Sequence, residues 1–184
     1  MISRLLLAMK SALAAECADL ALSCPEKGAD GKDTARPPRV YIGDFPAKRE
    51  GGQGVREMPC IVLSPLSGFA GEGQEFLDIV AHLCVYNNES GDAEGLEMEL
   101  LLLQSAVSRF IGAALFTPLE RRFLAVPDEK ERIYRWQRNG DLETPRPFAQ
   151  VALVSRWAVP GWQSGGPRTI HSFPPELPAR RPHE

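Results

Sequence analysis

The sequence predicts an α+β fold in the order α-β-β-β-α-β-β, with two main helices packed on one face of a mostly antiparallel sheet of about five strands. Two segments repeat apolar residues at helical spacing, and the strands come in runs instead of alternating with helices. Hydrophobic residues make up 43% of the 184 residues and charged residues 24%, as is usual for globular domains. We therefore expect one domain over residues 1–160, with a flexible loop at about 23–38 and a Pro- and Gly-rich tail at 161–184.

The first element is predicted to be an amphipathic helix from Ser3 to Leu22. Its apolar residues recur at steps of three and four, with charged side chains off that stripe. Lys10 stops the apolar run after five residues, so the segment does not resemble a secretory leader. No run reaches the ~18 apolar residues of a membrane span. We expect a protein that is cytosolic where it is made, with no membrane partner.

Three strands are predicted next. Arg39–Ile42 is short, and Pro59–Pro65 starts at a proline, where a missing N–H is tolerated. After a turn at Gly68–Gly73, the segment Glu75–Asn87 alternates an unbroken apolar face with a second face that is also largely apolar. This segment is the strongest strand prediction in the chain.

The second helix is predicted to begin with Asp92 as its N-cap and to end at Thr117. Its apolar stripe steps by three and four throughout, and Leu101, Leu102, Ala106 and Ile111 widen the stripe, so we expect a well-buried helix. Two further strands are predicted at 131–138 and 148–159, and the chain from residue 160 onward lacks periodicity.

Composition disfavours several functional classes. The net charge is −3, whereas a protein that binds nucleic acid by neutralising phosphates is expected to be basic. The four cysteines form no CxxC pair and lack a histidine at zinc-finger spacing, which indicates a reducing compartment and predicts no metal site. We find no dinucleotide or phosphate-binding loop, so no cofactor is expected.

One group of side chains on a predicted strand has the residue types of a Cys–His catalytic site. His82 shares a strand face with Asp78 and Cys84, at spacings that would make the side chains neighbours. A half-buried strand histidine is the simpler interpretation, and a small cytosolic enzyme is the alternative. A single-strand nucleic-acid binder using Arg132–Arg138 around Tyr134 and Trp136 is another alternative.

Both faces of the strands 76–86 and 148–159 are largely apolar, although a sheet covered on one side should be polar on the other. We expect a second copy of the chain to cover the extra face, with Gly43–Met58 folding over it as the intramolecular alternative. The predicted subunit-interface residues, all on or beside that face, are Phe76, Val80, His82, Cys84, Tyr86, Val154 and Arg156.

Charge is also segregated along the chain. Residues 71–100 contain eight acidic residues and no Lys or Arg, whereas residues 101–184 contain twelve basic and eight acidic residues. Opposite charges on different patches of one subunit would set the register of a head-to-tail ring. Two solvated faces are the alternative explanation.

Several short phrases resemble small tail proteins of long-tailed bacteriophages and prophages, namely the tail terminator (tail-completion) family. The phrases lie at Pro38–Arg49, Met58–Leu63, Cys84–Tyr86, Pro145–Phe148 and Trp157–Pro160. The resemblance covers about residues 1–160 and concerns the order of elements as much as the phrases.

The resemblance implies a structural assembly protein and no enzyme. Its members form a ring, usually a hexamer, that caps the tail tube, stops tube polymerisation and provides the surface on which the head docks. The implied partners are other copies of the chain, the major tail tube protein and the head–tail connector protein. The implied location is the tail–neck junction of the virion, and the host cytoplasm during assembly. Another phage neck component, such as a head–tail connector or stopper, is the alternative.

Overall fold

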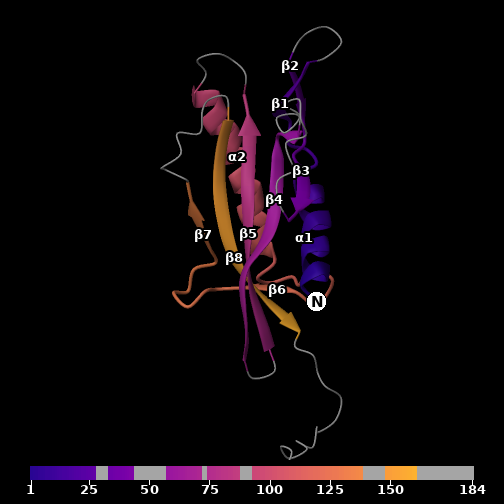
Figure 1. Cartoon of the computed structure of the whole chain (residues 1–184), viewed down its shortest axis with the longest axis vertical. Helices are drawn as coiled ribbons and strands as arrows, with labels where there is room; N and C mark the ends of the chain where they lie inside the picture. Colours follow the sequence, from indigo (N-terminus) through magenta and orange to yellow (C-terminus); the bar gives the residue numbers. More distant parts are fainter. Residues whose placement is uncertain (28–32, 44–56, 72–73, 88–92, 139–147, 161–184) are drawn as a thin grey trace, which may run out of the picture.

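The computed structural model describes residues 1–27, 33–43, 57–71, 74–87, 93–138 and 148–160 (Figure 1). Within these ranges the fold is α+β, with two helices and a mostly antiparallel main sheet, as predicted. The expected tail at 161–184, the Asp92 cap and the phrase Pro145–Pro147 lie outside the described residues.

The main sheet has six strands in the described residues, in the spatial order β3-β4-β5-β8-β6, and β7 pairs with β8 alongside β6. This corrects the expected count of five strands and the expected order. In chain order the strands are β3 (Arg39–Ile42), β4 (Cys60–Gly71), β5 (Gln74–Tyr86), β6 (Leu124–Val126), β7 (Tyr134–Gln137) and β8 (Phe148–Pro160).

Two long antiparallel pairs form the centre of this sheet. β5 pairs with β8 over its whole length, from Gln74 opposite Pro160 to Tyr86 opposite Phe148. β4 pairs with β5 on the other side, with one irregularity between Pro65 and Ser67. The predicted turn at Gly68–Gly73 is therefore wrong at its start, because β4 continues to Gly71.

The sheet is mixed because β3 runs parallel to β4. A parallel pair requires a connection of a dozen or more residues, and the chain between Ile42 and Cys60 supplies that length. The short β6, at 124–126, was not predicted, because three apolar residues in a row carry no strand periodicity.

A second, two-stranded sheet replaces much of the loop expected at 23–38. β1 (Leu22–Lys27) and β2 (Asp33–Arg36) pair antiparallel, with Leu22 opposite Arg36. Leu22 consequently belongs to a strand, and the first helix ends earlier than predicted. The sequence did not predict this hairpin, because Pro25 and the charged residues around it are typical of a loop.

The helices α1 (Ile2–Glu16) and α2 (Ala93–Ala113) contribute to one hydrophobic core with the same side of the sheet, and α2 lies behind β5 and β8 in Figure 1. Leu5 and Leu13 of α1 and Leu103 of α2 are fully buried there. Each such side chain contributes on the order of 1.5–3 kcal/mol before conformational entropy is counted.

Trp157 on β8 lies at the centre of this core and is fully buried. Its ring centroid is 5.9 Å from that of Phe110 of α2, and its indole Nε1–H donates to Oγ of Ser155 at 2.9 Å. Ser155 is itself buried, and its hydroxyl oxygen gives the buried indole N–H an acceptor inside the core.

The outward side of α2 is less buried than predicted. Leu101 and Leu102 are 46% and 51% exposed, and Met98 is 53% exposed. Leu101 and Leu102 belong to the opposite side of the helix from the core stripe, so the expectation that they widen the buried face is wrong, whereas Ala106 and Ile111, from which the same was expected, are buried. We call Met98, Leu101 and Leu102 the helix patch.

Candidate subunit-contact surface

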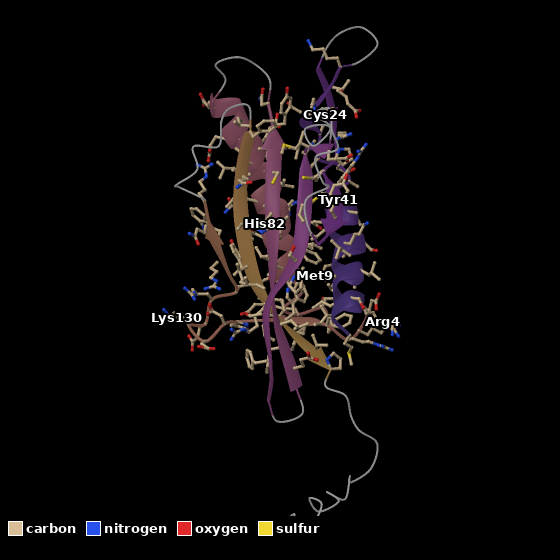
Figure 2. All side chains as sticks on the ribbon, viewed as in Figure 1. Arg4, Met9, Cys24, Tyr41, His82 and Lys130 are labelled. Carbon is tan, nitrogen blue, oxygen red and sulfur yellow. The ribbon has the colours of Figure 1, made fainter. Side chains whose placement is uncertain are left out.

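The sheet has a second side, which faces away from both helices and which we call the open face. Alternation along β5 and β8 gives it the even-numbered side chains of both strands. All seven predicted interface residues lie on it, and Figure 2 shows His82 near the middle of the sheet.

The open face is divided into a covered part and a partly exposed part. Val80, Cys84 and Tyr86 are buried within the single chain. Tyr86 packs against Phe148, with ring centroids 5.4 Å apart. These three residues therefore do not require a second copy to shield them, and that part of the sequence argument fails.

Phe76, His82, Val154 and Arg156 are only partly buried. Part of each of these side chains is therefore in contact with solvent in the single chain. Burial lowers the pKa of His82 below its ordinary value, because removal from water disfavours the charged imidazolium. His82 is therefore a neutral side chain at neutral pH, which suits a contact surface of mixed character.

A partly buried ion pair between β5 and β8 lies on the open face. Arg156 donates from Nε to Oδ1 of Asp78 at 2.8 Å, and Ser67 donates its hydroxyl to Oδ2 at 2.9 Å. The guanidinium holds the pKa of Asp78 below its ordinary value. Arg156 also lies over the ring of Phe69, 5.1 Å from its centroid, and within 3.5 Å of Glu129.

A cavity of about 250 Å³ opens beside this ion pair. Its walls come from β7, β8 and the turn before β7, and Figure 2 places Lys130 on that turn. Lys130 and Arg135 bring positive charge to the rim and the exposed Glu129 brings negative charge; among the residues that the structure describes, Lys130 and Arg135 form no ion pair. The cavity is a polar socket with Val154 as an apolar wall.

The structure does not assemble the Cys–His enzyme considered from sequence. The carboxylate of Asp78 binds Arg156 and Ser67. The thiol of Cys84 interacts with Cys60, and this contact together with burial raises the pKa of Cys84 strongly, so its thiol stays protonated. A protonated, buried thiol is a poor nucleophile.

Within the described residues, the arginine cluster around β7 is partly neutralised. Arg132 forms an ion pair with Asp128, and Arg138 forms one with Glu97 of α2. Trp136 is 57% exposed beside Arg135. Two of the acidic residues in the segregated stretch, Asp78 and Glu97, are thus used inside the chain instead of between copies.

Sequence patterns missed some residues of this surface. Phe69 was placed in a turn, and Glu129 and Lys130 had no recognisable role. The one available signal for Phe69 was its position four residues beyond a predicted strand, where an extended hairpin would continue the pairing.

The described residues contain no group of three or more His, Cys, Asp or Glu side chains arranged to hold a metal ion. Among them, neither helix is long and apolar enough to cross a membrane. No known protein-family model matches the chain, and no curated protein sequence matches it with significant similarity.

Proposed function

We propose that this protein is a structural component of a long-tailed bacteriophage, which assembles head to tail into a ring and caps the tail tube. The observation that carries the proposal is a pair of partly exposed surfaces on opposite sides of one small domain, a mixed one on the open face and an apolar one at the helix patch. The open face lies on the sheet, and the helix patch lies on the far side of α2, behind the sheet (Figure 1).

Two different patches on opposite sides of a subunit are what a head-to-tail ring requires, because each interface joins unlike surfaces. Burying Val154 of one copy against Leu101 and Leu102 of the next would remove apolar surface from water in both. An isologous dimer would instead use one patch against itself.

Charge complementarity supports the same pairing. Glu94 is exposed one helical turn before Met98, so the helix patch carries an acidic rim. The socket beside Val154 is lined by four basic and three acidic residues, and because Arg132 and Arg156 pair with Asp128 and Asp78, it is Lys130 and Arg135 that outweigh Glu129 and give it a small positive excess. Opposite charges at two unlike patches favour the head-to-tail contact and disfavour contact between like patches.

The role at the tail tube rests on the resemblance of short phrases to tail terminator proteins. In that role the ring stops tube polymerisation and provides the docking surface for the head–tail connector protein. A connector or stopper role would use a ring of the same kind, so ring formation alone does not separate the two.

Size-exclusion chromatography with light scattering tests the ring. We expect Val154→Asp and Leu102→Asp each to abolish it, because each places a charge in one patch. Leu7→Asp is the matched control, since Leu7 is a half-exposed leucine of α1 outside both patches. Mixing the two patch variants should give a heterodimer, because only one intact pair of patches remains.

Electron microscopy with the tube protein encoded nearby tests the cap. We expect the wild-type protein at one end of each tube, with tubes that stop growing, whereas a connector or stopper would leave tube growth unchanged. A wild-type protein that stays monomeric both alone and with tubes would contradict ring assembly itself.

A further inference from the structure

Two cysteines face each other across the antiparallel pair β4–β5, where Cys60 is directly opposite Cys84. Both are buried, and with Val62 they form a small cluster separate from the main core. Directly opposite residues of antiparallel strands have Cα atoms about 4.5 or 5.5 Å apart, and both values fall within the range of disulfides. The backbone therefore already has the spacing that a cross-strand disulfide needs.

We propose that Cys60 and Cys84 form a dithiol site that reacts with hydroperoxides and closes to a cross-strand disulfide. The inference rests on the register of the strands and does not depend on the proposed function. It assigns a chemical role to the covered part of the open face, which subunit contact does not use.

The two thiols are not equivalent. The contact with Cys84 lowers the pKa of Cys60, whereas it raises the pKa of Cys84. The physical cause is that the Cys84 thiol stabilises the Cys60 thiolate by hydrogen bonding. Cys60 is consequently the attacking sulfur and Cys84 the resolving one.

The chemistry balances with peroxide as the oxidant. The Cys60 thiolate attacks one peroxide oxygen, the O–O bond breaks, and the products are a sulfenic acid on Cys60 and hydroxide, which takes up the proton lost by Cys60 to become water. The Cys84 thiol then passes its proton to the sulfenic oxygen of Cys60 as its Sγ bonds to Sγ of Cys60; the S–O bond breaks and a second water leaves, so the neighbouring sulfenic acid is what allows this otherwise poor nucleophile to react. The two thiols lose two electrons, and the peroxide gains them.

Two side chains cover the Cys60–Cys84 pair and control access to it. Tyr41 of β3 and Met58 pack on the cluster, and both are only partly buried. Hydrogen peroxide is close to water in size, so a local opening of these side chains admits it. A large disulfide oxidant would need a wider opening.

The remaining two cysteines provide internal controls. Cys17 is fully buried, and burial raises its pKa to about 11, so it stays a thiol. Cys24 is opposite Thr34 in the β1–β2 pair, with its Sγ 2.8 Å from Oγ1 of that residue. Neither is paired with another cysteine in the strand registers.

The test treats the full-length protein with hydrogen peroxide, alkylates it under denaturing conditions and measures its intact mass. We expect two of the four thiols to become protected, and peptide mapping should join Cys60 to Cys84. Reduction before alkylation should restore four reactive thiols. Four free thiols after peroxide, or a link through Cys17 or Cys24, would overturn the proposal.

Single variants test the order of the two sulfurs. In Cys84→Ala the sulfenic acid on Cys60 has no resolving partner, so a dimedone adduct should accumulate there. Cys60→Ala should give no adduct on Cys84, and Cys17→Ala should leave the disulfide intact. Circular dichroism checks that each variant folds, and equal adducts at both positions would overturn the assigned roles. The mass measurement on the wild-type protein stands even if a variant does not fold.

Discussion

The hydrogen bond between Trp157 and Ser155 gives the sharpest stability prediction. Ser155→Ala leaves the indole N–H without the acceptor that it has in the core, 2.9 Å away, and removes only one oxygen atom. A buried donor left unsatisfied costs about 1–3 kcal/mol, and the small volume change adds little. We expect a loss of about 2 kcal/mol in the free energy of unfolding, which at about 2–4 °C per kcal/mol corresponds to roughly 4–8 °C in Tm.

The assay is urea unfolding followed by circular dichroism, with linear extrapolation to water. Ser105→Ala is the control, because it removes a serine hydroxyl from the exposed side of α2, and it should change stability by less than about 0.5 kcal/mol. Trp157→Phe should cost more, since it also leaves unfilled space.

A double-mutant cycle isolates the hydrogen bond from packing. In the Trp157→Phe background the donor is already absent, so adding Ser155→Ala should cost close to nothing. If Ser155→Ala costs the same in both backgrounds, the hydrogen bond does not account for the effect. A cost below about 0.5 kcal/mol in the wild-type background would refute the reasoning outright.

Three further predictions concern the ion pair and two glycines. Asp78→Asn should destabilise the protein by about 1.5–3 kcal/mol at pH 7, whereas Glu97→Gln in an exposed pair should cost less than about 0.5 kcal/mol. The folded-state pKa of Asp78 is lowered, so the stability that its carboxylate contributes is complete above the unfolded pKa of about 3.9 and is lost as pH falls through the folded pKa. The urea midpoints of the wild type and Asp78→Asn should therefore converge in acid. A constant difference between the two midpoints across pH would contradict this. Gly68→Ala should cost about 1–3 kcal/mol, since an added Cβ would lie 2.7 Å from Leu77 Cδ2 and 3.2 Å from the Phe76 carbonyl oxygen. Gly112→Ala, in α2 with open space around it, should instead stabilise the protein by about 1 kcal/mol, and a thermal melt of both variants checks the opposite signs.

The parts of the fold that sequence predicted well are those with long, regular periodicity. α2 and the strands at 74–86 and 148–160 each carry enough repeats for spacing to identify them, and their observed ends lie close to the predicted ones. β1, β2 and β6 have six, four and three residues, too few for a pattern, and they form through pairing with partners that are distant or irregular. The parallel placement of β3 depends on the path of its connection, which local sequence does not encode.

The candidate surface was predicted only in outline. Alternation predicted that the seven residues share one side of the sheet, and the strand registers agree, because side-chain direction has a period of two. It did not reveal which of them the chain covers itself, since Tyr41 and Met58 approach Cys84 from outside that strand. The exposure of Leu101 and Leu102 was missed for a related reason, because an apolar residue on a helix can face solvent as well as the core.

The position of β8 between β5 and β6 affects how the chain folds while it is being synthesised. Protein synthesis releases the N-terminal part first, and β8 is the last strand in the described residues, although it supplies one whole neighbour of the central strand. Until Trp157 has emerged, a nascent chain has an unpaired edge on β5 and an unfilled core against α2. The domain can therefore complete its folding only at the end of translation. A polypeptide that stops short of residue 148 should be prone to aggregation and short-lived in the cell.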